Sequence, residues 1–208
     1  MFDKMRTAMI DRQLRTTGVN DPAVLGAMRS VDRERFVPVA KQLLAYSDAM
    51  IELAPGRWLM EPMTLGLLLT HAAVRRSDRV LVVGAGTGYG AAVLARLTPH
   101  VTALEEVPEL AAAARANGVA VVEGPLVTGW AANAPYDVIL CEGAVAEVPP
   151  ALLGQLVERG RLAAVMVRKG VGRATLGHYA AGHLTTTAFI EAGLPVLPGF
   201  APKPQFVF

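Results

Sequence analysis

The chain has 208 residues, of which 52% are hydrophobic and 18% charged, so it can form one domain with a substantial core. A net charge of +2 gives no support for electrostatic binding to nucleic acid or membrane, and the single cysteine, Cys141, excludes an internal disulfide. The opening MFDKMRTAMIDRQL lacks the apolar core of a signal peptide, and no apolar run is as long as a membrane span. We therefore expect a cytoplasmic protein without nucleic-acid or membrane partners.

Residues 1–78 are predicted to be mostly helical. Helical spacing of apolar residues ends at Gly18, and Asn20-Asp21-Pro22, a capping side chain followed by proline, is typical of a helix start, here of the stretch AVLGAMRSV. Glu61-Pro62 opens another helix, MTLGLLLTHAAV. The segment that follows has a different order of predicted elements.

From residue 79 onward, short apolar strands alternate with helices. The predicted strands are 80–83, 101–104, 119–122, 138–141 and 161–167, and the predicted helices are 91–97, 108–116 and 149–158. Two antiparallel strands, 175–181 and 183–190, follow, and the proline-rich tail 194–208 is expected to be irregular with a final edge strand. This alternation predicts an α/β fold in which helices cover both faces of a mainly parallel sheet. We expect a single domain, 1–208, with a helical region (1–78) and a core (79–208).

Three glycines, Gly84, Gly86 and Gly88, follow the first predicted strand. Glycines at such a turn let the backbone approach a ligand, and the next helix would offer free N–H groups to an anion. Glu105 lies 21 residues past Gly84, at the end of the second strand, where a carboxylate can accept both hydroxyls of a ribose. The turn and Glu105 together suggest an adenosine-containing ligand.

The glycine pattern by itself leaves alternatives open. Counted from Gly84 it is G-x-G-x-G, whereas GTGYGA from Gly86 fits the dinucleotide pattern G-x-G-x-x-A, and a nicotinamide-dependent oxidoreductase would use it. We favour the first register because Gly84 directly follows the strand. A structural turn without a ligand is the third interpretation.

Matched segments along nearly the whole chain resemble protein-L-isoaspartate O-methyltransferases. They are MIDRQLRTTGVNDPAVLGAMRSVDRERFVP, AYSDAMIELAPG, VLVVGAGTGYGAAVLARL, VTALEEVPEL, TGWAANAPYDVILCEGA and PPALLGQLVERGRL, in that order. The resemblance implies a Rossmann-like fold with a seven-stranded sheet, and methyl transfer from S-adenosylmethionine to isoaspartyl carboxylates of damaged proteins. It further implies that Gly84, Gly86, Gly88 and Glu105 hold this co-substrate.

The chain departs from the family pattern where the acceptor is expected to bind. The family motif G-Q-T-I-S-Q-P is replaced by GRWLMEP, residues 56–62, so that Trp58 and Met60 stand at the threonine and serine positions. A methionine donates no hydrogen bond, so Met60 cannot orient an acceptor as serine does. Arg57, in the same motif, can attract a carboxylate. We name Trp58 and Met60 as candidate, degenerate catalytic positions.

Two further departures lie near the expected donor site. An acidic residue two places before the first glycine is replaced by Val82, and a family acid near the adenine is replaced by Pro125. Neighbouring acids (Glu106, Glu123 and Glu142) could substitute for them. Three functions therefore remain open: the family's methyl transfer, methyl transfer to a different acceptor, and a catalytically inactive binding protein. The four histidines lie at no metal-ligand spacing, so we expect no metal site.

Overall fold

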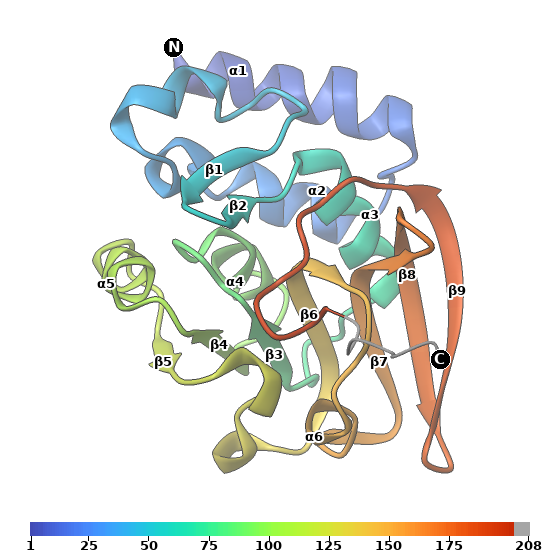
Figure 1. Cartoon of the computed structure of the whole chain (residues 1–208). Helices are drawn as coiled ribbons and strands as arrows, with labels where there is room; N and C mark the ends of the chain where they lie inside the picture. Colours follow the sequence, from blue (N-terminus) through green and yellow to red (C-terminus); the bar gives the residue numbers. More distant parts are fainter. Residues whose placement is uncertain (202–208) are drawn as a thin grey trace.

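The computed structural model describes residues 1–201. The chain begins with helical segments, most of which lie beyond one end of a large sheet, whereas the last packs against strands of the sheet (Figure 1). These segments are α1 (Phe2–Ala8), η1 (Met9–Leu14), η2 (Arg15–Thr17), α2 (Pro22–Arg29), η3 (Arg33–Phe36), η4 (Val39–Leu44) and α3 (Pro62–Ala72). Asp21 caps α2 as predicted, because its carboxylate accepts the N–H groups of Ala23 and Val24 at 2.8 and 3.1 Å. No helix within residues 1–201 is long and apolar enough to span a membrane.

A small hairpin between η4 and α3 escaped the sequence prediction. It consists of β1 (Ile51–Ala54) and β2 (Arg57–Leu59), which pair in antiparallel fashion around Gly56. Gly56 has φ of +72°, which glycine adopts without steric cost. The hairpin carries the first part of the divergent motif 56–62, and its strand β2 contacts β6 (Tyr136–Val145).

The core is a seven-stranded sheet with the order β5-β4-β3-β6-β7-β8-β9. Its strands are β3 (Val80–Val83), β4 (Val101–Glu105), β5 (Val121–Glu123), β6 (Tyr136–Val145), β7 (Leu156–Arg168), β8 (Val171–Ala180) and β9 (His183–Glu191). Strands β3 to β7 pair in parallel, whereas β8 and β9 are antiparallel, as predicted. The sheet reverses its winding between β3 and β6, the place where ligands bind in open α/β sheets.

The strand residues alternate between two hydrophobic clusters, one on each face of the sheet. Val80 and Val82 of β3 belong to the cluster that includes residues of α2, α3 and α4, whereas Leu81 and Val83 belong to the cluster of α6 (Pro150–Leu153). The remaining helices of the core are α4 (Tyr89–Leu94) and α5 (Pro108–Ala116). Helices therefore cover both faces, and the predicted α/β class is confirmed.

One local prediction was wrong, and another falls partly outside the described residues. Residues 149–158 were expected to be helical, but α6 ends at Leu153 and β7 begins at Leu156. Gln155 accounts for the break, because its side chain bonds to the Thr128 carbonyl at 2.7 Å and accepts the Trp130 N–H at 2.9 Å. In the tail, residues 194–201 form no strand beyond one isolated bridge, Val196 to Ala144. The rest of the predicted edge strand, 202–208, lies outside the described residues.

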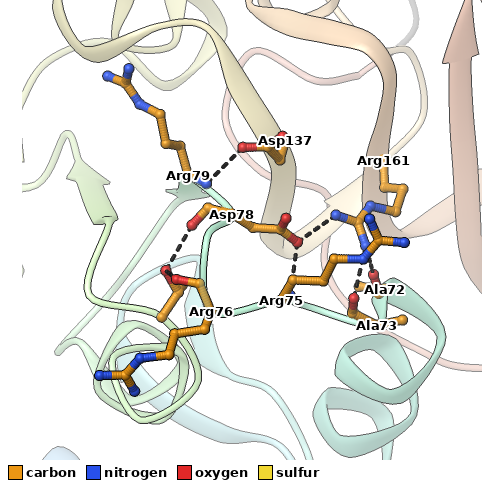
Figure 2. A network of polar contacts seen from close by, with 9 residues as sticks. Ala72, Ala73, Arg75, Arg76, Asp78, Arg79, Asp137 and Arg161 are labelled. Carbon is orange, nitrogen blue, oxygen red and sulfur yellow. Dashed lines mark hydrogen bonds and ion pairs between the residues drawn. The ribbon is translucent and has the colours of Figure 1, made fainter.

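A polar network fixes the edge of the sheet where β3 and β6 begin (Figure 2). Asp78 accepts the backbone N–H of Arg75 at 2.9 Å and pairs with Arg161 of β7. Arg161 also donates to the carbonyls of Ala72 and Ala73, at the end of α3. The network thus joins one helix end to the start of two strands.

Candidate functional site

The glycine turn after β3 has the geometry that the sequence predicted. Gly84, Gly86 and Gly88 have φ of +77°, +56° and +97°, values that side chains other than glycine rarely allow. The N–H groups of Gly84 and Ala85 both bond to the carbonyl of Leu104 at 3.0 Å. The turn is therefore held against the end of β4, directly beside the predicted ribose-binding acid.

Glu105 ends β4 and is completely buried. Its Oε2 accepts the N–H of Gly86 at 2.7 Å, and its Oε1 accepts those of Glu106 and Val107 at 2.9 and 3.0 Å. Three backbone donors thus hold this carboxylate in one orientation. Because bonds from the glycine turn and from the β4–α5 connection meet on it, Glu105 lies at the centre of the predicted donor site.

Arg57 of the β1–β2 hairpin occupies the remaining side of this carboxylate. Its Nη1 and Nη2 donate to the two oxygens of Glu105, the second at 2.7 Å, in a bidentate ion pair. Arg57 is 3% exposed. The sequence suggested that Arg57 could attract a carboxylate, and the carboxylate that it binds is one of the chain's own.

Apolar side chains complete the cover over the glycine turn. A Cβ placed on Gly86 would lie 2.9 Å from Leu53 of β1, and one placed on Gly84 would lie 3.1 Å from Leu197. Leu197 lies in the segment 195–200, which bonds along the end of β6: the Leu197 N–H donates to the Ala144 carbonyl at 2.9 Å. Hairpin and tail therefore both approach the glycines that the sequence assigned to a ligand.

An adenosyl ribose does not fit this conformation of the site. Ribose hydroxyls would donate to the oxygens of Glu105, but Arg57 and the three backbone N–H groups already supply five donors to them. The expected crevice with a free Glu105 is thus replaced by an internal ion pair. Binding of the co-substrate through Glu105 requires Arg57 to leave it.

The two divergent motif positions lie on or just after β2. Trp58 is half-buried and pairs across the hairpin with Glu52, whereas Met60 is 2% exposed and belongs to the hydrophobic core. The Met60 carbonyl accepts a hydrogen bond from Arg33 Nη2 at 2.6 Å. The backbone at position 60 is therefore held independently of which side chain it carries.

Arg33 is a fully buried cation that sequence reasoning missed. Its Nε donates to the Ala45 carbonyl at 2.7 Å, and its guanidinium lies 4.6 Å from the ring centroid of Tyr89. Within the described residues, Arg33 Nη1 and the Tyr89 hydroxyl have no hydrogen-bond partner. Burial lowers the pKa of Arg33 and raises that of Tyr89. Arg33 stands in a run of four charged residues, DRER, which is typical of an exposed segment, so the sequence does not predict its burial.

Glu142 of β6 is a second buried carboxylate at this edge of the sheet. It is 6% exposed, and its Oε1 would lie 1.6 Å from a Cβ on Gly90, in the first turn of α4. Burial raises the pKa of Glu142 to about 8; the positive charges of Arg33 and Arg57 oppose this rise, and the negative charge of Glu105 adds to it. No ion-pair partner lies within 4.0 Å of Glu142 in residues 1–201. It is thus a buried acid near two arginines but paired with neither.

The other residues weighed from the sequence lie around this centre. Val82 is fully buried inside β3, and Pro125 is exposed at the start of η5 (Leu126–Thr128). Glu106 Oε2 accepts the Leu126 N–H at 3.5 Å, which places this acid next to Pro125. Glu123, by contrast, pairs with Arg115 at the surface at 2.6 Å. Of these two neighbouring acids, Glu106 is the better placed to replace the acid lost at Pro125.

Cys141 is buried and adds no reactive group to the site. Burial raises the pKa of Cys141 to about 12, and its side chain packs in the core, so the thiol is not a nucleophile at neutral pH. Within residues 1–201, no group of three or more histidines, cysteines and acids could hold a metal ion.

Solved structures support the methyltransferase fold. The chain is similar to a protein-L-isoaspartate O-methyltransferase with a TM-score of 0.79 and 24% identity, covering 96% of this chain and 66% of the other. It is equally similar, at a TM-score of 0.79 and 17% identity, to a structure from Plasmodium falciparum described as a putative protein-L-isoaspartate O-methyltransferase in complex with S-adenosyl-L-homocysteine, covering 92% of this chain and 97% of that one. At these identities the likeness shows the fold, and the predicted Rossmann-like methyltransferase fold is confirmed.

Sequence comparison identifies the family as well as the fold. The family described as protein-L-isoaspartate(D-aspartate) O-methyltransferase matches residues 4–175. The protein-L-isoaspartate O-methyltransferase of Methylorubrum extorquens is 44% identical over 163 residues, 76% of this chain and 72% of that one. The enzyme of the same name from Methanoculleus marisnigri is 37% identical over 166 residues, 76% of each chain. The chain therefore belongs to the protein-L-isoaspartate(D-aspartate) O-methyltransferase family, whose members transfer a methyl group from S-adenosylmethionine.

Proposed function

We propose that this chain, as one domain located in the cytoplasm, transfers the methyl group of S-adenosylmethionine to the carboxylate of isoaspartyl residues in damaged proteins. Gly84, Gly86, Gly88 and Glu105 hold the co-substrate, and the motif 56–62, with Trp58 and Met60, faces the acceptor. The observation that carries the proposal is the place of Glu105. It ends β4, the strand beside β3 and its glycine turn, at the carboxyl ends of the parallel strands, and three backbone N–H groups aim its carboxylate.

The reaction requires little acid–base catalysis by the protein. A carboxylate is already ionised at neutral pH, so the chain has to supply orientation and an enclosed site. The hairpin is suited to this task because it carries the acceptor motif and also contacts the glycine turn through Leu53. A fully buried Arg33 holds the backbone at Met60 in place.

The test is transfer of a labelled methyl group from S-adenosylmethionine to an isoaspartyl peptide, with the aspartyl peptide of the same sequence as a negative control. We expect transfer to the isoaspartyl peptide alone. Glu105→Gln should abolish it, whereas Glu109→Gln, a matched change at an exposed position of α5, should leave the rate unchanged. Equal rates for the wild type and Glu105→Gln would refute the role of Glu105.

One observation favours a second function, a binding protein without turnover. The bidentate Arg57–Glu105 pair occupies the position that the ribose would take. In this case neither S-adenosylmethionine nor S-adenosylhomocysteine would bind, and the isoaspartyl peptide would bind without being methylated. A third possibility, methyl transfer to a different acceptor, is supported by the bulky Trp58 and the apolar Met60, and would appear as donor binding without transfer to isoaspartyl peptides.

A further inference from the structure

Two buried arginines, Arg33 and Arg57, and two buried carboxylates, Glu105 of β4 and Glu142 of β6, lie near the carboxyl ends of the parallel strands, and within residues 1–201 they form one ion pair. Arg57 binds Glu105, whereas Glu142 has no ion pair within 4.0 Å in the described part of the chain. Arg33, the second arginine, is occupied by the carbonyls of Ala45 and Met60. This arrangement leaves one buried carboxylate without a cation of its own.

The bonds of Glu105 show what displacement of Arg57 would leave behind. Gly86, Glu106 and Val107 would still donate their N–H groups to the carboxylate. Glu105 thus needs no cation to stay oriented, and displacement of Arg57 vacates one hydrogen-bonding position on each of its two oxygens. Other hydrogen-bond donors can therefore take the place of Arg57 on Glu105.

The arginine, by contrast, needs a new anion. Arg57 is 3% exposed, and a buried guanidinium without a partner is strongly unfavourable. Its Nη2 would lie 3.0 Å from a Cβ on Gly84, so it sits against the very turn that a donor must approach. Glu142 is the other buried carboxylate at this end of the sheet: its Oε1 lies against Gly90 at the start of α4, and the charge of Arg57 acts on it.

We propose that Arg57 is an internal ligand that competes with the donor's ribose for Glu105, and that Glu142 receives the Arg57 guanidinium when the donor binds. This inference rests on the proposed donor site and adds its regulation. Arg57 lies on the hairpin that carries the acceptor motif, so its transfer from one acid to the other shifts the segment that meets the acceptor. Donor binding is thereby coupled to formation of the acceptor site, and the acceptor binds second.

The family motif itself supplies the variant that tests competition. The family has glutamine where this chain has Arg57, so Arg57→Gln removes the internal ligand and restores the family residue. We expect Arg57→Gln to bind S-adenosylhomocysteine at least tenfold more tightly than the wild type in calorimetric titrations. Arg35→Gln, the same change at an exposed position of η3, should leave the affinity unchanged. Arg57→Lys, which keeps the charge but not the bidentate pairing, should lie between the two and serves if the glutamine variant fails to fold.

A second variant tests the receiving acid. Glu142→Gln should weaken S-adenosylhomocysteine binding severalfold when Arg57 is present, because the displaced guanidinium then has no anion. In the Arg57→Gln background the same change should have no effect. This dependence on Arg57 distinguishes a receiving acid from a residue that supports the site by packing alone.

The outcomes separate this inference from the proposed function. If Arg57→Gln binds more tightly and still methylates no isoaspartyl peptide, the competition stands and the proposed reaction fails. If the wild type and Arg57→Gln bind equally and both methylate the peptide, the reaction stands and the competition is refuted. Absence of binding by both proteins, or an equal effect of Glu142→Gln in both backgrounds, also overturns the inference.

Discussion

The two edges of the central sheet each carry a buried arginine–carboxylate pair, and the pairs differ in what surrounds them. At the edge where β3 begins, Arg161 and Asp78 are 14% and 6% exposed. At the opposite edge, where β3 and β4 end, Arg57 and Glu105 are 3% and 0% exposed. Judged by burial alone, the second pair would be the more structural of the two.

The hydrogen-bond partners of the two ion pairs lead to the opposite conclusion. Asp78 and Arg161 also bind the backbone at Arg75, Ala72 and Ala73, so their pair joins a helix end to two strands (Figure 2). Arg57, by contrast, has Glu105 as its one side-chain partner among the described residues and comes from a hairpin outside the sheet. A pair that fixes backbone ends belongs to the scaffold, whereas a pair placed over glycines is replaceable by a ligand.

The largest expected effect is loss of the scaffold pair. Asp78→Asn should lower the free energy of unfolding by about 2–3 kcal/mol, because it leaves a buried Arg161 without its anion; partial exposure of Arg161 keeps the cost below that of a fully buried pair. Urea denaturation measures this change.

The matched control comes from the same network. Asp137→Asn removes a half-buried carboxylate that accepts the Arg79 N–H at 2.8 Å, and it should cost about 1 kcal/mol or less. Affinity for S-adenosylhomocysteine should stay unchanged in both variants. A large loss of affinity in Asp78→Asn without a loss of stability would contradict the division between scaffold and site.

The next effect concerns the site edge and depends on pH. The pKa of Glu142 is raised by burial from 4.5 to about 8, against the charges of Arg33 and Arg57 and with that of Glu105; Tyr89 also faces it. Between pH 4.5 and 8 the unfolded chain has released a proton that the folded chain retains, so this group favours the folded state less as the pH rises. Above pH 8 the loss levels off.

Glu142→Gln removes this dependence. Relative to the wild type, the variant should gain on the order of 2 kcal/mol in unfolding free energy at pH 6.5 compared with pH 5. Thermal and urea denaturation at the two pH values measure the difference. A gain of the same size at both pH values would mean that Glu142 is ionised throughout this range.

A smaller effect is expected from two glycine-to-alanine changes in helices. In Gly90→Ala the new Cβ would lie 1.6 Å from Glu142 Oε1, so the acid must move, at a cost of about 1–2 kcal/mol. Gly26→Ala in α2 meets nothing within 4 Å and should stabilise the chain by about 0.5–1 kcal/mol. If the two variants changed the unfolding free energy in the same direction relative to the wild type, the placement of Glu142 over α4 would be contradicted.

The same contrast explains which features the sequence could predict. Local patterns predict the strand Val80–Val83, whose residues alternate between the two hydrophobic clusters. They also predict the turn of Gly84, Gly86 and Gly88. The structure has both. The short hairpin at Ile51–Leu59 has no such pattern, because pairing across Gly56 decides it. Contacts between distant segments, Arg57 with Glu105 and Arg33 with Met60, leave no mark on residue spacing, and they determine whether the predicted site is open.

The smallest expected effect is at Met60, where the site edge departs from its family in hydrogen-bonding capacity. Met60→Ser restores a donor to the acceptor motif, and Arg33 continues to hold the backbone there. One added hydrogen bond is worth about 0.5–1.5 kcal/mol, so methyl transfer to an isoaspartyl peptide should rise by roughly twofold to tenfold at saturating donor. Because Trp58 occupies the neighbouring family position, Trp58→Thr together with Met60→Ser should exceed either change alone. A single change that matches the double variant would place the acceptor against one of the two positions only.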